Sequence, residues 1–169
     1  MVGSAARSQG TSGQSPEAQP ELDAPRGARF AIVAARFNAN IVDRLLEGAT
    51  AELKARGVAA GDLVTVRVPG AFELPLACKR IAEKGDVHAV IALGCVIRGG
   101  TPHFEYVCSA AAHGCQDVAL ATGVPVAFGV LTTDDLAQAE ARSGPDSANK
   151  GREAALAALE MIAVFPQER

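Results

Sequence analysis

The chain has 169 residues, a formal net charge of -3 and a hydrophobic content of 49%, but only 4% of its residues are aromatic. This length suits one domain with a full core, which must be built from Ala, Val, Leu and Ile because aromatic side chains are scarce. The charge balance argues against nucleic acid as a partner, and no apolar run approaches the roughly 18 residues of a membrane helix.

Residues 1–28 are rich in Ser, Gly, Pro and Gln and have no apolar periodicity. We expect this segment to be a disordered tail, and residues 29–169 to form one domain. Within that domain, short apolar runs alternate with segments of helical periodicity. Strands are predicted at 29–35, 62–68, 87–95 and 124–131. Helices are predicted at 41–57, 71–85, 102–123, 134–142 and 150–164, with Asn40, Thr101 and Thr133 as N-caps of the first, third and fourth.

The alternation of strands and helices indicates an α/β fold with a parallel sheet covered by helices on both faces. We expect a three-layer α/β/α sandwich around a central four-stranded parallel sheet, of the flavodoxin-like type. In such sheets ligands bind beyond the carboxyl ends of the strands. This rule selects four loops, "ARFNAN", "VPGAFE", "CVIRGGTPH" and "LTTDD".

The loop "CVIRGGTPH" has the pattern of an anion site. Thr101 is a suitable N-cap and Pro102 suits the first helical position. Gly99 and Gly100 let the backbone approach a ligand closely, and the free N–H groups of a helix N-terminus bind phosphate or carboxylate. Arg98 is near enough in sequence to add positive charge. The alternative interpretation is a plain glycine turn before a well-capped helix.

His103 is expected in the first turn of that helix, where a neutral imidazole could accept a proton. The alternative is a structural histidine, as we expect His113 to be. Glu73 opens the second helix, where it either favours the helix dipole or binds a polyol together with backbone amides. Phe37 follows the first strand and either stacks on a planar ring or makes a simple core contact.

The sequence lacks the motifs of several common nucleotide, hydrolase and metal sites. GxGxxG, GxxxxGK[ST] and GxSxG are absent, and no His, Cys and Asp residues have metal-ligand spacing. The four cysteines form no CxxC pair, so we expect inert thiols in a reducing cytoplasm, with attention to Cys95 at a strand end. We therefore expect an acid–base site for a phosphorylated substrate, with no metal and no redox cofactor.

Five segments in order resemble the lumazine synthase family: "RFN", "VPGAFELP", "ALGCVIRGGTPHFEYV", "GVPVAFGVLTTD" and "ANKGREAALAALEM". The resemblance runs from about Arg29 to Phe165. It implies condensation of 5-amino-6-(D-ribitylamino)uracil with 3,4-dihydroxy-2-butanone 4-phosphate, which gives 6,7-dimethyl-8-ribityllumazine, phosphate and water.

The resemblance also implies roles for individual residues. His103 matches the proton-transfer residue, and Glu153 stands where many relatives have an Asp thought to support the histidine. The remaining implied site residues are Phe37 for ring stacking, Ala71, Phe72 and Glu73 for the ribityl chain, Val96 and Ile97 for the pyrimidine, Gly100 and Thr101 for phosphate, Phe128 and Arg142 contributed by a neighbouring subunit, and Lys150 as a further basic residue near the site.

The resemblance implies a homopentamer. In some members of the family, twelve pentamers assemble into a hollow shell of sixty subunits. The turn "SGPDSANKG" lacks the insertion of relatives that stop at pentamers, but Pro145 and Asp146 stand where shell-forming relatives often have Thr and Lys. Riboflavin synthase is a candidate partner. Two other functions stay open, a non-catalytic flavin or lumazine carrier and a container. The set of His103, Thr101 and Arg142 favours the enzyme, because a carrier needs no proton shuttle.

Overall fold

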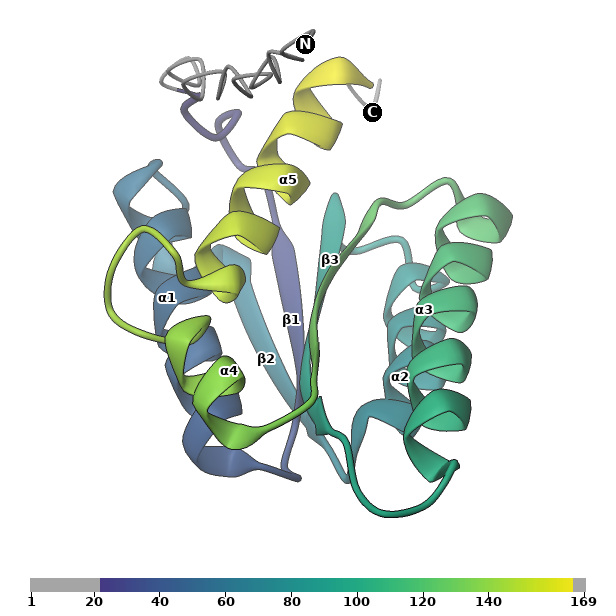
Figure 1. Ribbon diagram of the computed structural model, residues 1–169. Helices are drawn as coiled ribbons and strands as arrows, with labels where there is room; N and C mark the ends of the chain where they lie inside the picture. Colours follow the sequence, from purple (N-terminus) through teal and green to yellow (C-terminus); the bar gives the residue numbers. More distant parts are fainter. Residues whose placement is uncertain (1–21, 166–169) are drawn as a thin grey trace, which may run out of the picture.

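A computed structural model describes residues 22–165 of the chain, which form one parallel sheet with helices on both faces (Figure 1). The sheet has the order β2-β1-β3-β4, and Phe30 pairs with Leu63 on one side and with Ala89 on the other. All three pairings are parallel, as predicted. The strands are β1 (Phe30–Ala35), β2 (Leu63–Val68), β3 (Ala89–Ile97) and β4 (Val126–Thr133).

The helices form the two outer layers of the sandwich. Figure 1 shows α1 and α5 on one face of the sheet and α2 and α3 on the other, which confirms the three-layer, flavodoxin-like architecture. The expected helix at 71–85 begins as a 3₁₀ turn, Ala71–Glu73, and becomes α-helical at Leu74. The helices are α1 (Ala39–Ala55), α2 (Leu74–Ala82), α3 (His103–Thr122), α4 (Leu136–Ala141) and α5 (Lys150–Val164).

The core consists of two layers of apolar side chains, one on each face of the sheet. Alternate residues of β1 supply both: Phe30 and Ile32 pack towards α1 and α5, whereas Ala31 and Val33 pack towards α2 and α3. Every residue of β1 is buried for this reason, so the strand reads as an unbroken apolar run.

Small residues allow two helix pairs to approach closely. A Cβ on Gly151 of α5 would lie 2.0 Å from the backbone oxygen of Leu45 in α1. On the other face, a Cβ on Gly114 of α3 would lie 2.6 Å from the ring of Pro75 in α2. Glycine at these two positions therefore sets the spacing between the helices of each layer.

The start of α1 differs from the prediction. Asn38, rather than Asn40, precedes the helix, and its backbone lies in the left-handed region (φ 56°, ψ 45°) that Asn adopts more readily than most residues. Its side chain does not cap α1 but donates a hydrogen bond of 2.9 Å to the carbonyl of Cys95 at the end of β3. The side chain of Asn38 therefore bonds a neighbouring strand and not the N–H groups of α1.

The N-caps predicted for α3 and α4 are also wrong. α3 begins directly after Pro102 with no side-chain cap, so Thr101 does not fill that role. Asp135 caps α4 by accepting a 2.8 Å hydrogen bond from a backbone N–H three residues on. The hydroxyl of Thr133 instead donates to the carbonyl of Asp135 at 2.9 Å.

Residues 22–28, part of the segment expected to be a tail, contact the domain. The N–H of Ala24 donates to the carbonyl of Arg56 at 2.8 Å, and Leu22 packs against the core. The rest of the expected tail, residues 1–21, lies outside the described residues. Within residues 22–165, no helix combines the length and apolarity needed to cross a membrane.

Candidate functional site

The site lies at the carboxyl ends of β1 and β3, two adjacent parallel strands of the sheet. These neighbouring strands continue into helices on opposite faces of the sheet, because α1 packs on one face and α3 on the other. A crevice opens where the two loops diverge, which is the usual ligand position in open parallel sheets. Backbone hydrogen bonds fix its rim, from Arg36 to Val68 (2.8 Å) and from Phe37 to Pro69 (3.1 Å).

A cleft of about 600 Å³ occupies this crevice. The loops after β1, β2 and β3 and the first turns of α3 all line it. The structure thus brings together eight residues predicted from the sequence: Phe37, Ala71, Phe72, Glu73, Val96, Ile97, Thr101 and His103. Gly100 lies in the same loop as Thr101 but does not line the cleft.

Two aromatic side chains project from the rim. Phe37 is 71% exposed and Phe72 is 61% exposed, so neither is a core residue. In the same loop as Phe72, Gly70 leaves space for the carboxylate of Glu73, since a Cβ on Gly70 would lie 3.3 Å from Glu73 Oε2. The rim thus offers apolar rings and a carboxylate to a planar ligand with a polar chain.

The structure adds residues that the sequence analysis did not select. Tyr106 and Val107 line the cleft beside His103, on the same face of α3. The spacing i, i+3, i+4 from His103 was the signal that could have identified them. Tyr106 is 72% exposed, so its phenol is accessible from the cleft.

The sequence position of Arg98 suggested that it adds a free positive charge to this loop. In the structure its guanidinium is instead paired with two carboxylates. Its Nε donates to Asp134 Oδ1 at 2.8 Å, its Nη1 donates to Glu105 Oε1, and its guanidinium lies 4.2 Å from the ring centroid of Phe104. The hydrogen bond from Arg98 lowers the pKa of the Glu105 carboxyl. Arg98 lines neither this cleft nor the next one.

A second cleft, of about 380 Å³, lies along β4 and α5 and contains the other predicted residues. Phe128, Arg142 and Lys150 line it together with Glu153. The Nζ of Lys150 lies 2.7 Å from Glu153 Oε2. Within one chain, therefore, Glu153 pairs with a lysine and does not line the cleft of His103.

The chain matches the model of a known protein family along almost its whole described length. The family model for 6,7-dimethyl-8-ribityllumazine synthase matches residues 27–165, from just before β1 to just after α5. The chain belongs to this family. Lumazine synthases are transferases of riboflavin biosynthesis, and the family implies small-molecule substrates and assembly into homo-oligomers.

In this lumazine synthase, a buried asparagine holds the turn between α4 and α5. Asn149 is 3% exposed, and its side-chain oxygen accepts from the N–H groups of Gly151 (2.9 Å) and Arg152 (3.1 Å). Its amide donates to the carbonyls of Arg44 (3.1 Å), Ser143 (3.2 Å) and Gly144 (2.8 Å). A further backbone bond of 2.9 Å joins Lys150 to Arg142, so the turn fixes both cations of the second cleft.

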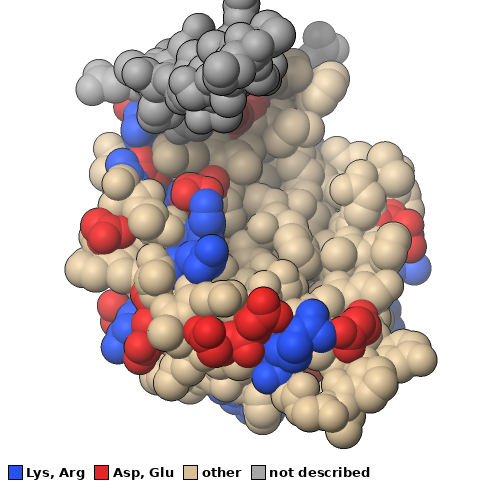
Figure 2. Space-filling view, in the orientation of Figure 1, with Lys and Arg blue, Asp and Glu red and all other residues tan. Residues whose placement is uncertain are grey.

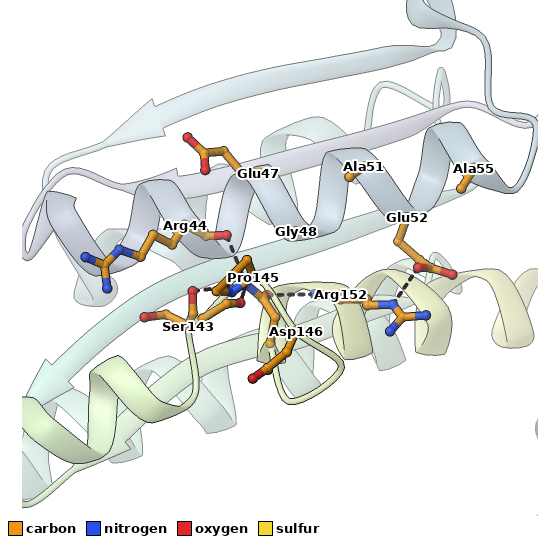
Figure 3. Close-up of a pocket in the computed structure, with 12 residues that line it drawn as sticks. Arg44, Glu47, Gly48, Ala51, Glu52, Ala55, Ser143, Pro145, Asp146 and Arg152 are labelled. Carbon is orange, nitrogen blue, oxygen red and sulfur yellow. Dashed lines mark hydrogen bonds and ion pairs between the residues drawn. The ribbon is translucent and has the colours of Figure 1, made fainter.

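A third cleft, of about 600 Å³, is lined by this turn, by α1 and by Arg152 of α5 (Figure 3). Figure 3 shows Arg44 and Arg152 at opposite ends, so the two guanidinium groups do not converge on a common ligand. The buried carboxylate of Glu52 binds Arg152 (2.6 Å) and Arg56 (2.8 Å). No residue predicted for the site lines this cleft.

Cys95 lines the first cleft, but its thiol belongs to the core and is not a nucleophile at neutral pH. Burial raises its pKa to about 11, so the thiol stays protonated. All four cysteines are free of disulfides, and the hydrogen bond that Cys78 donates to Cys115, together with burial, raises the pKa of Cys78. Among the predicted residues that line the first cleft, Glu73 and His103 are the two with a side chain that can accept a proton.

Proposed function

We propose that this lumazine synthase condenses 5-amino-6-(D-ribitylamino)uracil with 3,4-dihydroxy-2-butanone 4-phosphate, yielding 6,7-dimethyl-8-ribityllumazine, phosphate and water. The observation that carries the proposal is the cleft between the β1 and β3 loops. It combines two exposed phenylalanines, a carboxylate, a glycine-rich loop before a helix and an exposed histidine. These are the groups that a planar ring, a polyol, a phosphate and a proton transfer require.

The pyrimidine occupies the deeper part of the cleft in this proposal. Its ring stacks on Phe37, and the backbone of Val96 and Ile97 binds its polar edge. The ribityl chain lies along the Ala71–Glu73 turn, whose carboxylate and N–H groups bind its hydroxyls. The half-buried position of Val96 and Ile97 at the end of β3 supports this orientation.

The phosphorylated ketone lies against Gly100 and Thr101, beside the N-terminus of α3. The amine of the pyrimidine attacks the ketone carbonyl, and water leaves as the imine forms. Phosphate then departs as its C–O bond breaks, while His103 accepts the proton released from the neighbouring carbon. The enol left by this elimination becomes a ketone, and the ribityl-bearing nitrogen attacks that carbonyl, so a second water leaves as the ring closes. The enzyme supplies proximity and proton transfer, and no protein amine enters the covalent sequence.

The site is completed by a neighbouring subunit, which contributes Phe128, Arg142 and Lys150. Two observations support this. These residues line a cleft separate from that of His103 in the same chain, and β4 is an edge strand bordered by an apolar groove. In Figure 2 the face between α5 and α3 is largely free of charged side chains. We propose a homopentamer, with the sixty-subunit shell as its higher assembly and riboflavin synthase as the partner that takes the product.

Turnover of the two substrates by the purified protein tests the proposal. Formation of the lumazine chromophore is expected, and absence of turnover with authentic substrates would refute the assignment. His103→Ala should slow turnover roughly ten- to a hundredfold without changing the native mass. His113→Ala is the matched control, because that imidazole is also on α3 but bonds its own helix at Ser109 and lines no described cleft.

Arg142→Ala tests the contribution of the neighbouring subunit. We expect the KM for the phosphorylated ketone to rise and the KM for the pyrimidine to stay constant. Arg44→Ala is the control, because this exposed arginine lies in the third cleft. Equal KM values in the Arg142 variant and the wild type would contradict the role of Arg142.

A further inference from the structure

The loop that carries the proposed phosphate site has few anchors of its own. Residues 99–103 are all exposed, and a Cβ on Gly99 or Gly100 would meet nothing within 4 Å. No side chain caps α3. Over residues 98–105, every side-chain hydrogen bond in the described structure involves Arg98. Among the side chains of this segment, the guanidinium of Arg98 is therefore the one that ties the loop to neighbouring elements through hydrogen bonds.

Arg98 connects three separate elements around that loop. Its backbone N–H donates to the carbonyl of Thr133 at 2.8 Å, which fixes it at the ends of β3 and β4. Its side chain then binds Glu105 in the first turn of α3 and Asp134 after β4. Asp134 is itself held, because its N–H donates to Gln138 Oε1 in α4 at 3.1 Å.

The ring contact joins this network to the first turn of α3, directly after His103. Phe104, on which the guanidinium stacks, directly follows His103, and Glu105 follows Phe104. Figure 2 shows acidic and basic side chains side by side along the lower edge of the molecule, where in Figure 1 β4 leads into α4. The guanidinium also offsets two carboxylates that border a loop proposed to bind an anion.

We propose that Arg98 is a positioning residue, which holds the phosphate loop and His103 in their working geometry by bridging Glu105 and Asp134. The inference rests on the proposed function for the identity of the anion. Arg98 does not touch the substrate, because it lines neither cleft. Its two ion pairs are exposed, with 44% of its side chain accessible, so they add little to folding stability. The effect of Arg98 is expected in catalysis.

Steady-state kinetics of Arg98→Met test this role, since methionine keeps the apolar stem and removes the bridge. We expect the KM for the phosphorylated ketone to rise about tenfold and kcat to fall roughly tenfold, because small displacements of catalytic groups are costly. The KM for the pyrimidine should stay within about twofold, since Phe37 and the backbone of Val96 and Ile97 bind it, and pairing with β4 holds these two residues of β3 without the Arg98 side chain. Loss of folded protein would instead lower kcat and leave both KM values unchanged, and that result would overturn the inference.

Arg67→Met is the matched control. Arg67 also bridges elements, with Nη1 2.7 Å from Asp43 and Nη2 3.3 Å from the carbonyl of Ala35, but it lines neither the first nor the second cleft. We expect its kinetic constants to match the wild type. Equal effects of the Arg98 and Arg67 substitutions would overturn the inference. In the background Glu105→Gln, Asp134→Asn, replacing Arg98 should have little further effect, because its partners are already neutral.

Hydrogen exchange of the assembled protein tests the inference without any substrate. Peptides covering residues 98–109 should exchange about tenfold faster in Arg98→Met than in the wild type, because the first turns of α3 lose their tie to β4. The same peptides should be unaffected in Arg67→Met. Unchanged exchange would overturn the role of Arg98 whatever the turnover. Absence of wild-type turnover combined with faster exchange would refute the proposed function and leave the positioning role intact.

Discussion

Replacing Asn149 should destabilise the protein more than replacing a loop residue whose side chain is exposed to solvent. The side chain is buried and satisfies two N–H groups at the start of α5 and three carbonyls of the preceding turn and α1. The amide has two protons for three carbonyls, so one proton is shared. Figure 3 shows the turn lying against α1, where an alanine at this position would leave these groups without partners.

The magnitude follows from the bonds that Asn149→Ala removes. Loss of the N-cap costs about 1 kcal/mol, and loss of the donated hydrogen bonds about 1 kcal/mol for each amide proton, giving about 3 kcal/mol in total. A domain of this size loses roughly 3 °C in Tm per kcal/mol, so the Tm should fall by roughly 10 °C. Asn149→Ser keeps an oxygen for the cap and should lie between the two.

Thermal unfolding followed by circular dichroism measures these shifts. All variants are compared at one protein concentration, because assembly raises the apparent stability by mass action. Asp135→Ala serves as the control, since it removes one cap bond from the short, exposed helix α4. A Tm of Asn149→Ala equal to that of the wild type would refute the reasoning. A Tm of Asn149→Ser as low as that of Asn149→Ala would assign the whole effect to the carbonyls.

Three further predictions concern packing, pH and thiol reactivity. Gly151→Ala should cost about 3 kcal/mol in unfolding free energy, because its Cβ would press on the backbone of α1; Gly144→Ala, with nothing closer than 3.9 Å, should be neutral in the same denaturation series. Burial raises the pKa of the Glu52 carboxyl, but hydrogen bonds from two arginines outweigh this effect and lower the pKa overall. The carboxylate therefore stabilises the folded state fully above its unfolded pKa of about 4.3, and this stabilisation is lost as the pH falls through the folded pKa. Glu52→Gln should therefore lose stability at pH 7 and approach the wild type below about pH 4, whereas a constant difference would contradict the linkage. Among the four thiols, Cys108 should react first with maleimide in a native mass measurement, because Cys78 and its two buried counterparts are shielded until unfolding.

The sequence was sufficient for the features that depend on local pattern. Apolar runs located the four strands, and Gly57 and Gly123 end their helices with positive φ as expected. The prediction for the start of α1 failed because a polar side chain bonds a distant partner. Asn38 bonds Cys95, 57 residues on, so it does not act as an ordinary N-cap. No local rule indicates which of several polar groups a remote strand end will engage.

The same limit applies to the candidate site. Eight predicted residues converge because parallel strands bring their carboxyl ends to one edge of the sheet. The sequence predicted Arg98 in the anion loop but did not predict its ion pair with Asp134. Asp134 lies 36 residues away along the chain, and only the pairing of β3 with β4 brings the two residues together. Phe128 and Arg142 stand apart from His103 because β4 and α5 line a different cleft.

The exposed phenol of Tyr106 gives this enzyme a built-in optical reporter. The chain has one tyrosine and no tryptophan, so its intrinsic fluorescence originates from a single ring. That ring lines the cleft of His103. Quenching or energy transfer to a bound ligand is thus read at the proposed reaction centre itself, without a label and without background from the rest of the polypeptide.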